Sequence, residues 1–347
     1  MFKDLKIRAK ASFAAAIVIF STLNFLPAFA VQAKVTSQNI SGNNVNLDTA
    51  LYLPSKLPAP AILLAHGFGG SKDSTADEAK KLQDLGYVVM TYSARGFGKS
   101  TGLISMNNYD LEVADAKNLV DFLAANKDVA RDRQGQPLIG VTGASYGGAL
   151  SLMLAAKDSR IKAVASDITW SSLRNALFPQ YANSSKYVSA AGPFKRVWAG
   201  SFFNLSALQN TYLGQCGNFE EKWCQSFNDS MSGKSPTPAE LHLLAQSSPS
   251  QFISSVNAPT LLMQGQSDSL FPLSESLANS QVLIDKKVPV SLFWHAGGHD
   301  GGNTDDSLIF QATVNWFDKY LKGKALSILA FQLTDSQGSL SVTDSTA

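Results

Sequence analysis

The stretch Gly143-Ala144-Ser145-Tyr146-Gly147-Gly148 decides how the rest of the chain is interpreted. A short apolar run bounded by Pro and Gly, residues 137–142, precedes it and predicts a buried strand. An Ala- and Leu-rich run, residues 149–156, follows it and predicts a helix. Between a strand and a helix, G-x-S-x-G places its serine on a sharp turn that exposes the hydroxyl above the edge of a sheet. This context favours Ser145 as a nucleophile over an ordinary glycine-rich turn.

Apolar runs and helical patterns alternate through most of the chain. The runs that predict buried strands are 61–65, 87–92, 137–142, 161–168, 258–265 and 288–294, with a half-exposed strand at 45–53. The helical patterns are 75–85, 109–125, 149–156, 273–284 and 306–321. This alternation predicts an α/β protein with a mainly parallel sheet and helices on both faces.

The alternation stops between residues 169 and 257. This segment is rich in Ser, Asn, Gln and aromatic residues, and it has helical patches without buried-strand runs. We expect it to fold as a helical cap inserted into a core made of residues 31–168 and 258–322. Residues 323–347 would form a tail with one added strand near 328–333.

Residues 1–30 have the pattern of a secretory signal peptide. A basic segment ending at Lys10 precedes an apolar run from Ala11 to Leu26, and small residues at Ala28 and Ala30 allow cleavage after Ala30. The alternative is a retained membrane anchor, because this run approaches the length of a span. No later stretch is long enough to cross a membrane. We therefore expect an exported protein, secreted, periplasmic or at the cell surface, without a span once the signal is removed.

The charge of the chain argues against a nucleic-acid partner. The formal net charge is +2, of which residues 1–30 contribute +3, so the remaining residues carry about −1. A nucleic-acid-binding protein needs a basic face. We therefore expect no nucleic-acid partner.

Cys216 and Cys224 are the two cysteines of the chain. In an exported protein, two close cysteines favour a disulfide, with two free thiols as the alternative. Neither lies among residues spaced as zinc ligands, so no metal site is expected. The glycine loop at 67–71 lacks the spacing and the lysine of a phosphate-binding P-loop, and no cofactor is expected either.

A serine nucleophile needs a general base, and the base needs an acid to orient it. When the serine lies on a turn of this kind, the acid and then the histidine follow it in the chain, on loops after later strands. Asp268 lies just after the strand predicted at 258–265, whereas Asp285 ends a helix and Asp167 lies where the cap begins. We therefore predict Asp268 as the acid.

The sequence contains four histidines. His299 lies in a glycine-flanked loop that can turn towards Ser145, and we predict it as the base. His295, at the end of the last predicted core strand, is the alternative. His66 is expected to hold the shape of its glycine loop, and His242 to pack or lie on the surface of a cap helix.

Two backbone amides are predicted to bind the oxyanion of a tetrahedral intermediate. One is the N–H of Tyr146, at the start of the helix after the nucleophile, and the other is the N–H of Phe68 in the loop at 66–70. Each such donor typically lowers the barrier by about 2.7–4 kcal/mol. A second glycine loop begins at Arg95, which we expect to tie neighbouring loops together.

With these residues in place, residues 45–322 resemble an α/β-hydrolase. More narrowly, the chain resembles the Xaa-Pro dipeptidyl-peptidase-like (S15) group, which includes cocaine-esterase-like enzymes. The motifs behind this resemblance are residues 95–102 (RGFGKSTG), residues 143–148 and the position of the cap. Two departures concern specificity. Phe68 stands where members of the group often have a tyrosine whose hydroxyl is an oxyanion donor. Only a short tail follows Leu321, where members of the group carry a β jelly-roll domain.

The sequence thus predicts an exported serine hydrolase that cleaves an ester or amide bond of a small molecule or peptide through an acyl-enzyme. One alternative is an Xaa-Pro-type dipeptidyl peptidase, which needs a carboxylate for the substrate's amine, with three candidates in the cap: Glu220, Glu221 and Asp229. An alternative from another class is a non-catalytic binding protein on the same scaffold. Aromatic residues of the cap either line an apolar substrate pocket or form the cap's own core, among them Trp170, Phe178 and Tyr181.

Overall fold

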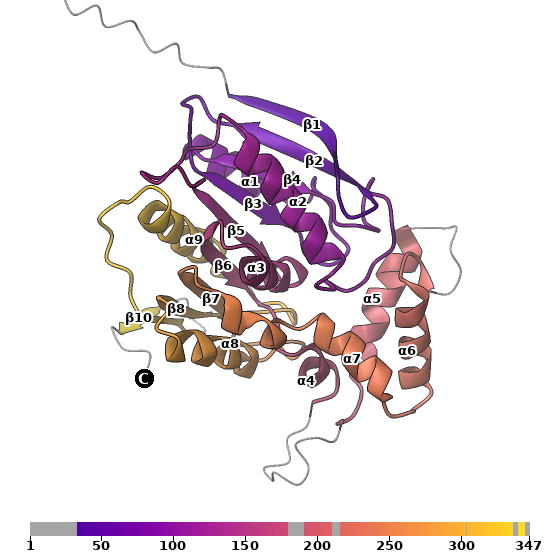
Figure 1. The fold of residues 1–347 in the computed structure, drawn as a ribbon. Coiled ribbons are helices and arrows are strands. Elements are labelled where there is room, and N and C mark those ends of the chain that lie inside the picture. The colour runs from indigo at the N-terminus through magenta and orange to yellow at the C-terminus, as the bar shows by residue number, and fades with distance from the viewer. Residues whose placement is uncertain (1–32, 180–190, 210–215, 303, 336–338, 344–347) are drawn as a thin grey trace, which may run out of the picture. The chain divides into compact units, whose positions relative to one another are not determined.

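One large sheet organises the computed structural model, which describes residues 33–179, 191–209, 216–302, 304–335 and 339–343. Among these residues the sheet has ten strands in the order β1-β2-β4-β3-β5-β6-β7-β8-β9-β10 (Figure 1). Strands β3 to β9 run parallel to one another, whereas β2 is antiparallel to β4 and β10 is antiparallel to β9. The strands are β1 Lys34–Ser41, β2 Asn46–Leu53, β3 Ala61–Ala65, β4 Val88–Tyr92, β5 Ile139–Ala144, β6 Ile161–Asp167, β7 Thr260–Gly265, β8 Val290–His295, β9 Phe331–Thr334 and β10 Leu340–Thr343.

Helices cover both faces of the sheet, as the α/β pattern predicts (Figure 1). Successive strand residues point to opposite faces, and the core is accordingly two apolar clusters, one containing Leu63 and the other Ile62 and Leu64. Helices α2, α3 and α8 contribute to the first cluster, and α1 and α9 to the second. Their bounds are α1 Ala76–Asp84, α2 Glu112–Ala125, α3 Tyr146–Lys157, α8 Leu273–Asp285 and α9 Asp306–Tyr320.

The sequence prediction missed two strands, β1 and β10. The edge strand β1, with the sequence KVTSQNIS, is mostly exposed and pairs antiparallel with β2. The tail contributes two strands where one was expected: β9 pairs with β8, and the fully exposed β10 pairs with β9. These strands are held by backbone hydrogen bonds at the sheet edges, so they lack the buried apolar residues on which the prediction relied.

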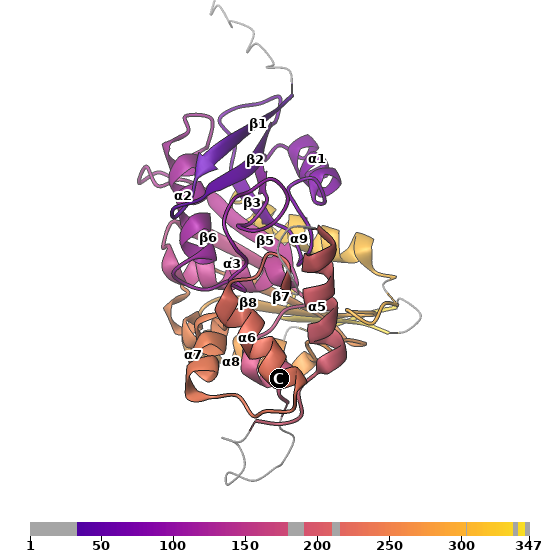
Figure 2. The same cartoon turned by 90° about the vertical axis from the view of Figure 1, so that its right-hand side faces the viewer.

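The segment between β6 and β7 contains four described helices: α4 Leu173–Leu177, α5 Arg196–Gln209, α6 Glu221–Met231 and α7 Pro238–Gln246. Helices α5, α6 and α7 lie together at one end of the sheet (Figure 2). Two short 3₁₀ turns, Pro249–Gln251 and Ile253–Ser255, lead back to β7. No described helix has the length and apolar composition needed to span a membrane.

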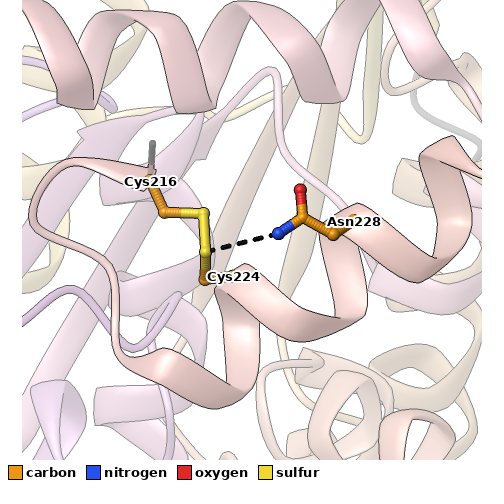
Figure 3. Close-up of a disulfide and its surroundings, with 3 residues drawn as sticks. All are labelled: Cys216, Cys224 and Asn228. Carbon is orange, nitrogen blue, oxygen red and sulfur yellow. Dashed lines mark hydrogen bonds between the residues drawn. A yellow bond between two sulfur atoms is a disulfide. The ribbon is translucent and has the colours of Figure 1, made fainter. Parts of the chain in front are cut away.

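Cys216 and Cys224 form a disulfide, with their Cα atoms 5.6 Å apart, so the alternative of two free thiols is wrong. The bond joins the turn before α6 to the first part of that helix, and Asn228 lies one turn further along it (Figure 3). The amide of Asn228 donates a hydrogen bond to the Cys224 sulfur at 3.6 Å.

Arg95 ties together segments that are distant in the sequence. Its guanidinium donates to both carboxylate oxygens of Asp115 on α2, at 2.7 and 2.9 Å, and to the backbone carbonyl of Asn43 at 2.9 Å. The Arg95 and Asp115 side chains are only 7% and 1% exposed. A buried, two-pronged pair of this kind depends on both partners, because either charge alone is poorly solvated.

We expect Arg95→Ala to lower the free energy of unfolding by about 3–5 kcal/mol, because it leaves the Asp115 carboxylate buried without its partner. The matched control is Lys80→Ala, which removes an exposed i,i+4 pair with Asp84 on α1 and should cost no more than about 0.5 kcal/mol. Urea denaturation of both variants measures the difference. Equal losses for the two would contradict this role of Arg95.

Candidate active site

Ser145 lies in a strained turn between β5 and α3. Its φ of 55° and ψ of −114° fall in a region that residues with a side chain rarely adopt. Its backbone N–H donates to the carbonyl of Asp167 at 2.9 Å. The hydroxyl of Thr169 donates to the carbonyl of Ser145 at 2.7 Å. The residues at the end of β6 therefore hold the turn on both sides of Ser145.

Glycines at 143 and 147 make this turn possible. A Cβ at Gly143 would lie 2.6 Å from the carbonyl oxygen of Ala65 at the end of β3, and a Cβ at Gly147 would clash with the same oxygen. At Gly148 a Cβ would lie 2.7 Å from the carbonyl oxygen of Asp167. The G-x-S-x-G pattern therefore reflects close backbone packing between β3, β6 and the start of α3.

The structure brings Ser145, His299 and Asp268 together in one chain of hydrogen bonds. Nε2 of His299 lies 2.8 Å from Oγ of Ser145, and Nδ1 lies 2.6 Å from Oδ2 of Asp268. The other carboxylate oxygen of Asp268 accepts the backbone N–H groups of Leu270 and Phe271 at 3.0 and 2.7 Å. Because a carboxylate only accepts, Nδ1 carries the proton and Nε2 is left to accept the serine hydroxyl. This is the arrangement that nucleophilic activation requires.

Two aromatic side chains fix the ring of His299. Phe271 meets it edge-on, with ring centres 5.1 Å apart, and Trp198 does so at 6.0 Å. Phe271 is also one of the residues whose backbone N–H holds Asp268. The orientation of the ring therefore depends on packing as well as on its hydrogen bonds.

His66 holds the glycine loop that contains Phe68. Its Nε2 accepts the backbone N–H of Ala94 at 2.9 Å, so Nδ1 carries the proton and donates to the carbonyl of Gly67 at 2.7 Å. Burial lowers the pKa of His66 to about 4, so the ring is neutral at pH 7. A neutral, fully buried ring with both nitrogens occupied acts as a brace for the loop.

No described residue accepts a hydrogen bond from the backbone N–H of Phe68 or of Tyr146. The ring of Phe68 packs instead into an aromatic cluster, with Phe97, Tyr146, Phe202 and Phe219 all at 5.0–5.7 Å between centres. The aromatic neighbours of Phe68 therefore hold its ring and, with it, the loop at 66–70.

A polar network under the first turn of α3 was not predicted. Asn107 donates its backbone N–H to the hydroxyl of Tyr146 at 2.9 Å and its side-chain amide to the carbonyl of Tyr146 at 2.7 Å. The Tyr146 hydroxyl donates to Glu112 at 3.3 Å, and burial raises the pKa of Glu112 to about 8. Met106 and Asn107 both have positive φ, 55° and 59°. Asparagine tolerates this conformation, so the pair Asn107-Asn108 was the sequence feature that could have indicated an unusual loop here.

The side chains of His295 and Asp167, the rival base and the rival acid, contact each other and not the hydroxyl of Ser145. Nε2 of His295 lies 2.8 Å from Oδ1 of Asp167, and both residues are buried. Asp285 ends α8, and His242 is exposed on α7. The described residues contain no cluster of three or more His, Cys, Asp or Glu side chains that could hold a metal ion.

The family model of X-Pro dipeptidyl-peptidases, the S15 family, matches residues 42–301, about three quarters of the chain. The chain belongs to this family. Over 137 residues it is 31% identical to the uncharacterized protein YcjY of Escherichia coli K12, a match that covers 38% of this chain and 43% of YcjY. The chain thus spans less than half the length of this relative.

Solved α/β-hydrolases share the fold. The acylaminoacyl peptidase of Pyrococcus horikoshii superimposes with a TM-score of 0.57 at 17% identity, over 88% of this chain and 43% of the peptidase. An esterase of Pyrococcus furiosus superimposes with a TM-score of 0.56 at 18% identity, over 83% of this chain and 92% of the esterase. At these identities the likeness shows that the S15 chain has the α/β-hydrolase fold and leaves its substrate open.

The cap residues expected near the substrate have different surroundings. Trp170 is 2% exposed, donates its indole N–H to the carbonyl of Ser247 and packs against Tyr146 and Phe271. Phe178 lines a cavity of about 40 Å³ between Met106 and the helices α5 and α6, which has room for about three water molecules. Tyr181 lies outside the described residues. A cavity of this size is too small for an aromatic acyl group.

One face of α5 borders the candidate site, and its two aromatic residues belong to the aromatic side chains of residues 169–257 that were expected either to line a pocket or to form a packed core. Trp198 and Phe202 lie one helical turn apart, so their side chains share a face. The first ring packs on His299 and the second on Phe68. Both are only partly buried. They therefore flank the position of Ser145 from the side of the base and from the side of the glycine loop.

We expect Gly147→Ala to lower the free energy of unfolding by about 1–3 kcal/mol, because its Cβ must displace the end of β3. Gly200→Ala in α5 is the control: its Cβ meets nothing within 4 Å, so it should be neutral or stabilising by up to about 1 kcal/mol. Denaturant unfolding monitored by tryptophan fluorescence compares them. A neutral Gly147→Ala would show that the elbow does not need its glycine.

Proposed function

We propose that the protein is a serine hydrolase that cleaves an ester or amide bond through an acyl-enzyme, with Ser145, His299 and Asp268 as its catalytic triad. The observation that carries this proposal is the continuous hydrogen-bond chain from Asp268 through His299 to Ser145, with links of 2.6 and 2.8 Å. Membership in the S15 family supports it.

In the first half-reaction, His299 Nε2 takes the hydroxyl proton while Ser145 Oγ bonds to the substrate carbonyl carbon. Asp268 then faces an imidazolium and stabilises it. The carbonyl oxygen becomes an oxyanion, for which the N–H groups of Phe68 and Tyr146 are the donors. His299 returns its proton to the leaving alcohol or amine as the bond to it breaks, which leaves the acyl group on Ser145.

In the second half-reaction, a water molecule takes the place of the leaving group. His299 removes a proton from the water as its oxygen bonds to the acyl carbon, and the same two amides hold the new oxyanion. The bond to Oγ then breaks, and the proton passes from His299 to Ser145. A carboxylic acid leaves, and the serine is restored.

The carboxylates of the cap favour an ester over a peptide with a free amino terminus. A dipeptidyl peptidase of the Xaa-Pro type is the alternative, and it needs a carboxylate for the substrate's α-amine. Glu220 is paired with Lys222 at 2.9 Å, and Asp229 with Lys234 at 2.7 Å. Glu221 is exposed on α6. The two paired carboxylates are already neutralised, which leaves a neutral apolar ester as the better substrate class.

The face of α5 supports an apolar substrate. An acyl or alkoxy group attached at Ser145 would lie between Trp198 on the side of His299 and Phe202 on the side of Phe68. Aromatic rings contribute large apolar contact areas at little conformational cost. We propose these two side chains as the wall that recognises the apolar part of the substrate.

We further propose that the protein is exported, with residues 1–30 as its signal peptide and residues 169–257 as a cap on the hydrolase core. The disulfide between Cys216 and Cys224 supports export, because such bonds persist in oxidising compartments. The signal segment itself lies outside the described residues.

A fluorophosphonate probe tests the nucleophile, because it reacts with activated serines. We expect wild type to be labelled and Ser145→Ala to remain unlabelled, and His299→Ala to lower kcat for p-nitrophenyl esters by a factor on the order of 10⁴ or more. No labelling of wild type, or equal labelling of Ser145→Ala, would support the non-catalytic binding protein instead. Comparing p-nitrophenyl esters with Gly-Pro and Ala-Pro anilides then separates esterase from dipeptidyl peptidase.

A substitution in α5 tests the substrate wall. We expect Trp198→Ala to raise KM for p-nitrophenyl butyrate about tenfold, the equivalent of about 1.4 kcal/mol, because an aromatic contact is lost. Val197→Ala is the control on the outer face of the same helix, where the side chain is 83% exposed, and should leave KM unchanged. An unchanged KM in Trp198→Ala would exclude the indole from substrate binding.

A further inference from the structure

A second histidine–carboxylate pair lies next to the candidate triad. Nε2 of His295, the last residue of β8, is 2.8 Å from Oδ1 of Asp167, the last residue of β6. Nδ1 of the same ring is 2.9 Å from the carbonyl oxygen of Ala296. The His295 side chain is 2% exposed and that of Asp167 13%. Neither residue has a role in the reaction proposed above.

The partners of His295 define its protonation state. A neutral imidazole has one N–H and one acceptor nitrogen. Both nitrogens of His295 face acceptors, a carbonyl oxygen and a carboxylate, so the ring satisfies both only as an imidazolium. Burial alone would lower its pKa, but the hydrogen bond and charge of Asp167 outweigh this and raise the pKa of His295 above its ordinary value.

The carboxylate partner is directly connected to the nucleophile turn. The backbone carbonyl of Asp167 accepts the N–H of Ser145 at 2.9 Å. Ile168, which follows it, has a φ of +36°, a strained conformation for a β-branched residue. Thr169 then donates to the carbonyl of Ser145. Fixing the side chain of Asp167 therefore fixes a strained segment that holds Ser145 from both sides.

His295 is connected in the same way to the loop of the base. Ala296, whose carbonyl accepts from the ring, donates its own N–H to Asp305 at 2.8 Å, and Asp305 also accepts the hydroxyl of Thr334 on β9. The backbone carbonyl of His295 accepts the N–H of Gln266 at 2.9 Å, at the start of the loop that bears Asp268. His299 follows three residues after Ala296.

From these contacts we propose that Asp167 and His295 form a buried carboxylate–imidazolium pair that positions the nucleophile turn and the base loop relative to each other. They are positioning residues, since neither touches Ser145 Oγ or the ring of His299. The proposal rests on the proposed hydrolase function for its activity readout alone, because the protonation state of His295 can be measured without turnover.

Other charged groups face this pair. Asp305, at the start of α9, adds negative charge near His295. Glu78 on α1 faces Asp167, and burial together with that negative charge raises the pKa of Glu78 to about 7, with Lys81 opposing the shift. The charge on Glu78 therefore changes near neutral pH, and Glu78→Gln removes its titration from any profile measured in this range.

The sign of the pH dependence follows from the raised pKa. Below that pKa the imidazolium makes both hydrogen bonds, and as the pH rises through it one nitrogen loses its proton and faces an acceptor. The positioning effect is therefore present below the raised pKa of His295 and lost on the alkaline side of it. The acylation rate of wild type is expected to fall there.

The substitution Asp167→Asn removes the negative charge of the side chain but keeps its shape. An asparagine amide donates to Nε2 of a neutral His295, whose Nδ1–H still reaches Ala296, so the hydrogen bonds survive without charge. In the Glu78→Gln background, we expect the alkaline decline in the p-nitrophenyl acetate burst rate to disappear in Asp167→Asn. In His295→Gln the neutral glutamine cannot form an ion pair with the Asp167 carboxylate, so kcat should fall about tenfold with KM unchanged. The control His242→Gln, exposed on α7, should change neither constant.

Imidazole ¹⁵N NMR of histidine-labelled protein provides the readout independent of activity. We expect His295, assigned by its loss in His295→Gln, to carry protons on both nitrogens at pH 7 in wild type and on one in Asp167→Asn. A neutral His295 in wild type at pH 7, or identical alkaline burst profiles for wild type and Asp167→Asn, overturns the proposal. Failure of fluorophosphonate labelling would instead overturn the hydrolase function and leave the NMR result standing.

Discussion

The close approach of three backbone segments around Ser145 is the constraint on which the rest of the site depends. The carbonyl oxygen of Ala65 leaves no room for a Cβ at Gly143 or Gly147, and Ser145 takes a conformation with φ of 55°. Such a turn persists only when its surroundings hold it. Here β3 presses on it from one side, and the segment from Asp167 to Thr169 binds its N–H and its carbonyl from the other.

The three histidines near this turn differ in protonation because their partners differ. His66 faces an N–H group and a carbonyl and is therefore neutral, whereas His295 faces two acceptors and carries two protons. His299 faces a carboxylate and a hydroxyl that can donate, so it keeps one free nitrogen for Ser145. Only this third environment suits a general base, because the other two rings have both nitrogens committed to fixed backbone or carboxylate partners.

The sequence predicted those features that burial or chain order determines. Continuous apolar runs located the core strands, whereas β1 and β10 were missed because they are exposed edge strands held by backbone pairing. Chain order placed Asp268 and His299 beside Ser145. It could not show that Asp167 and His295 pair with each other, since that contact requires two strand ends to meet at one edge of the sheet. Trp198 and Phe202 were among the aromatic residues left open between a pocket lining and a packed core, and their contacts with His299 and Phe68 depend on how α5 packs.

The packing of Phe219 on Phe68 connects the proposed cap to the proposed chemical centre. Phe219, within the loop closed by the disulfide, stacks on Phe68 at 5.7 Å and on Phe203 of α5 at 4.0 Å. The backbone of Ile104 accepts the N–H of Glu220 at 3.0 Å, so the same loop is tied to the core. Phe68 thus supplies its amide to the proposed oxyanion site and its ring to the cap. Because one residue serves both, a change in cap packing that moves this ring also moves the amide on which the chemistry depends.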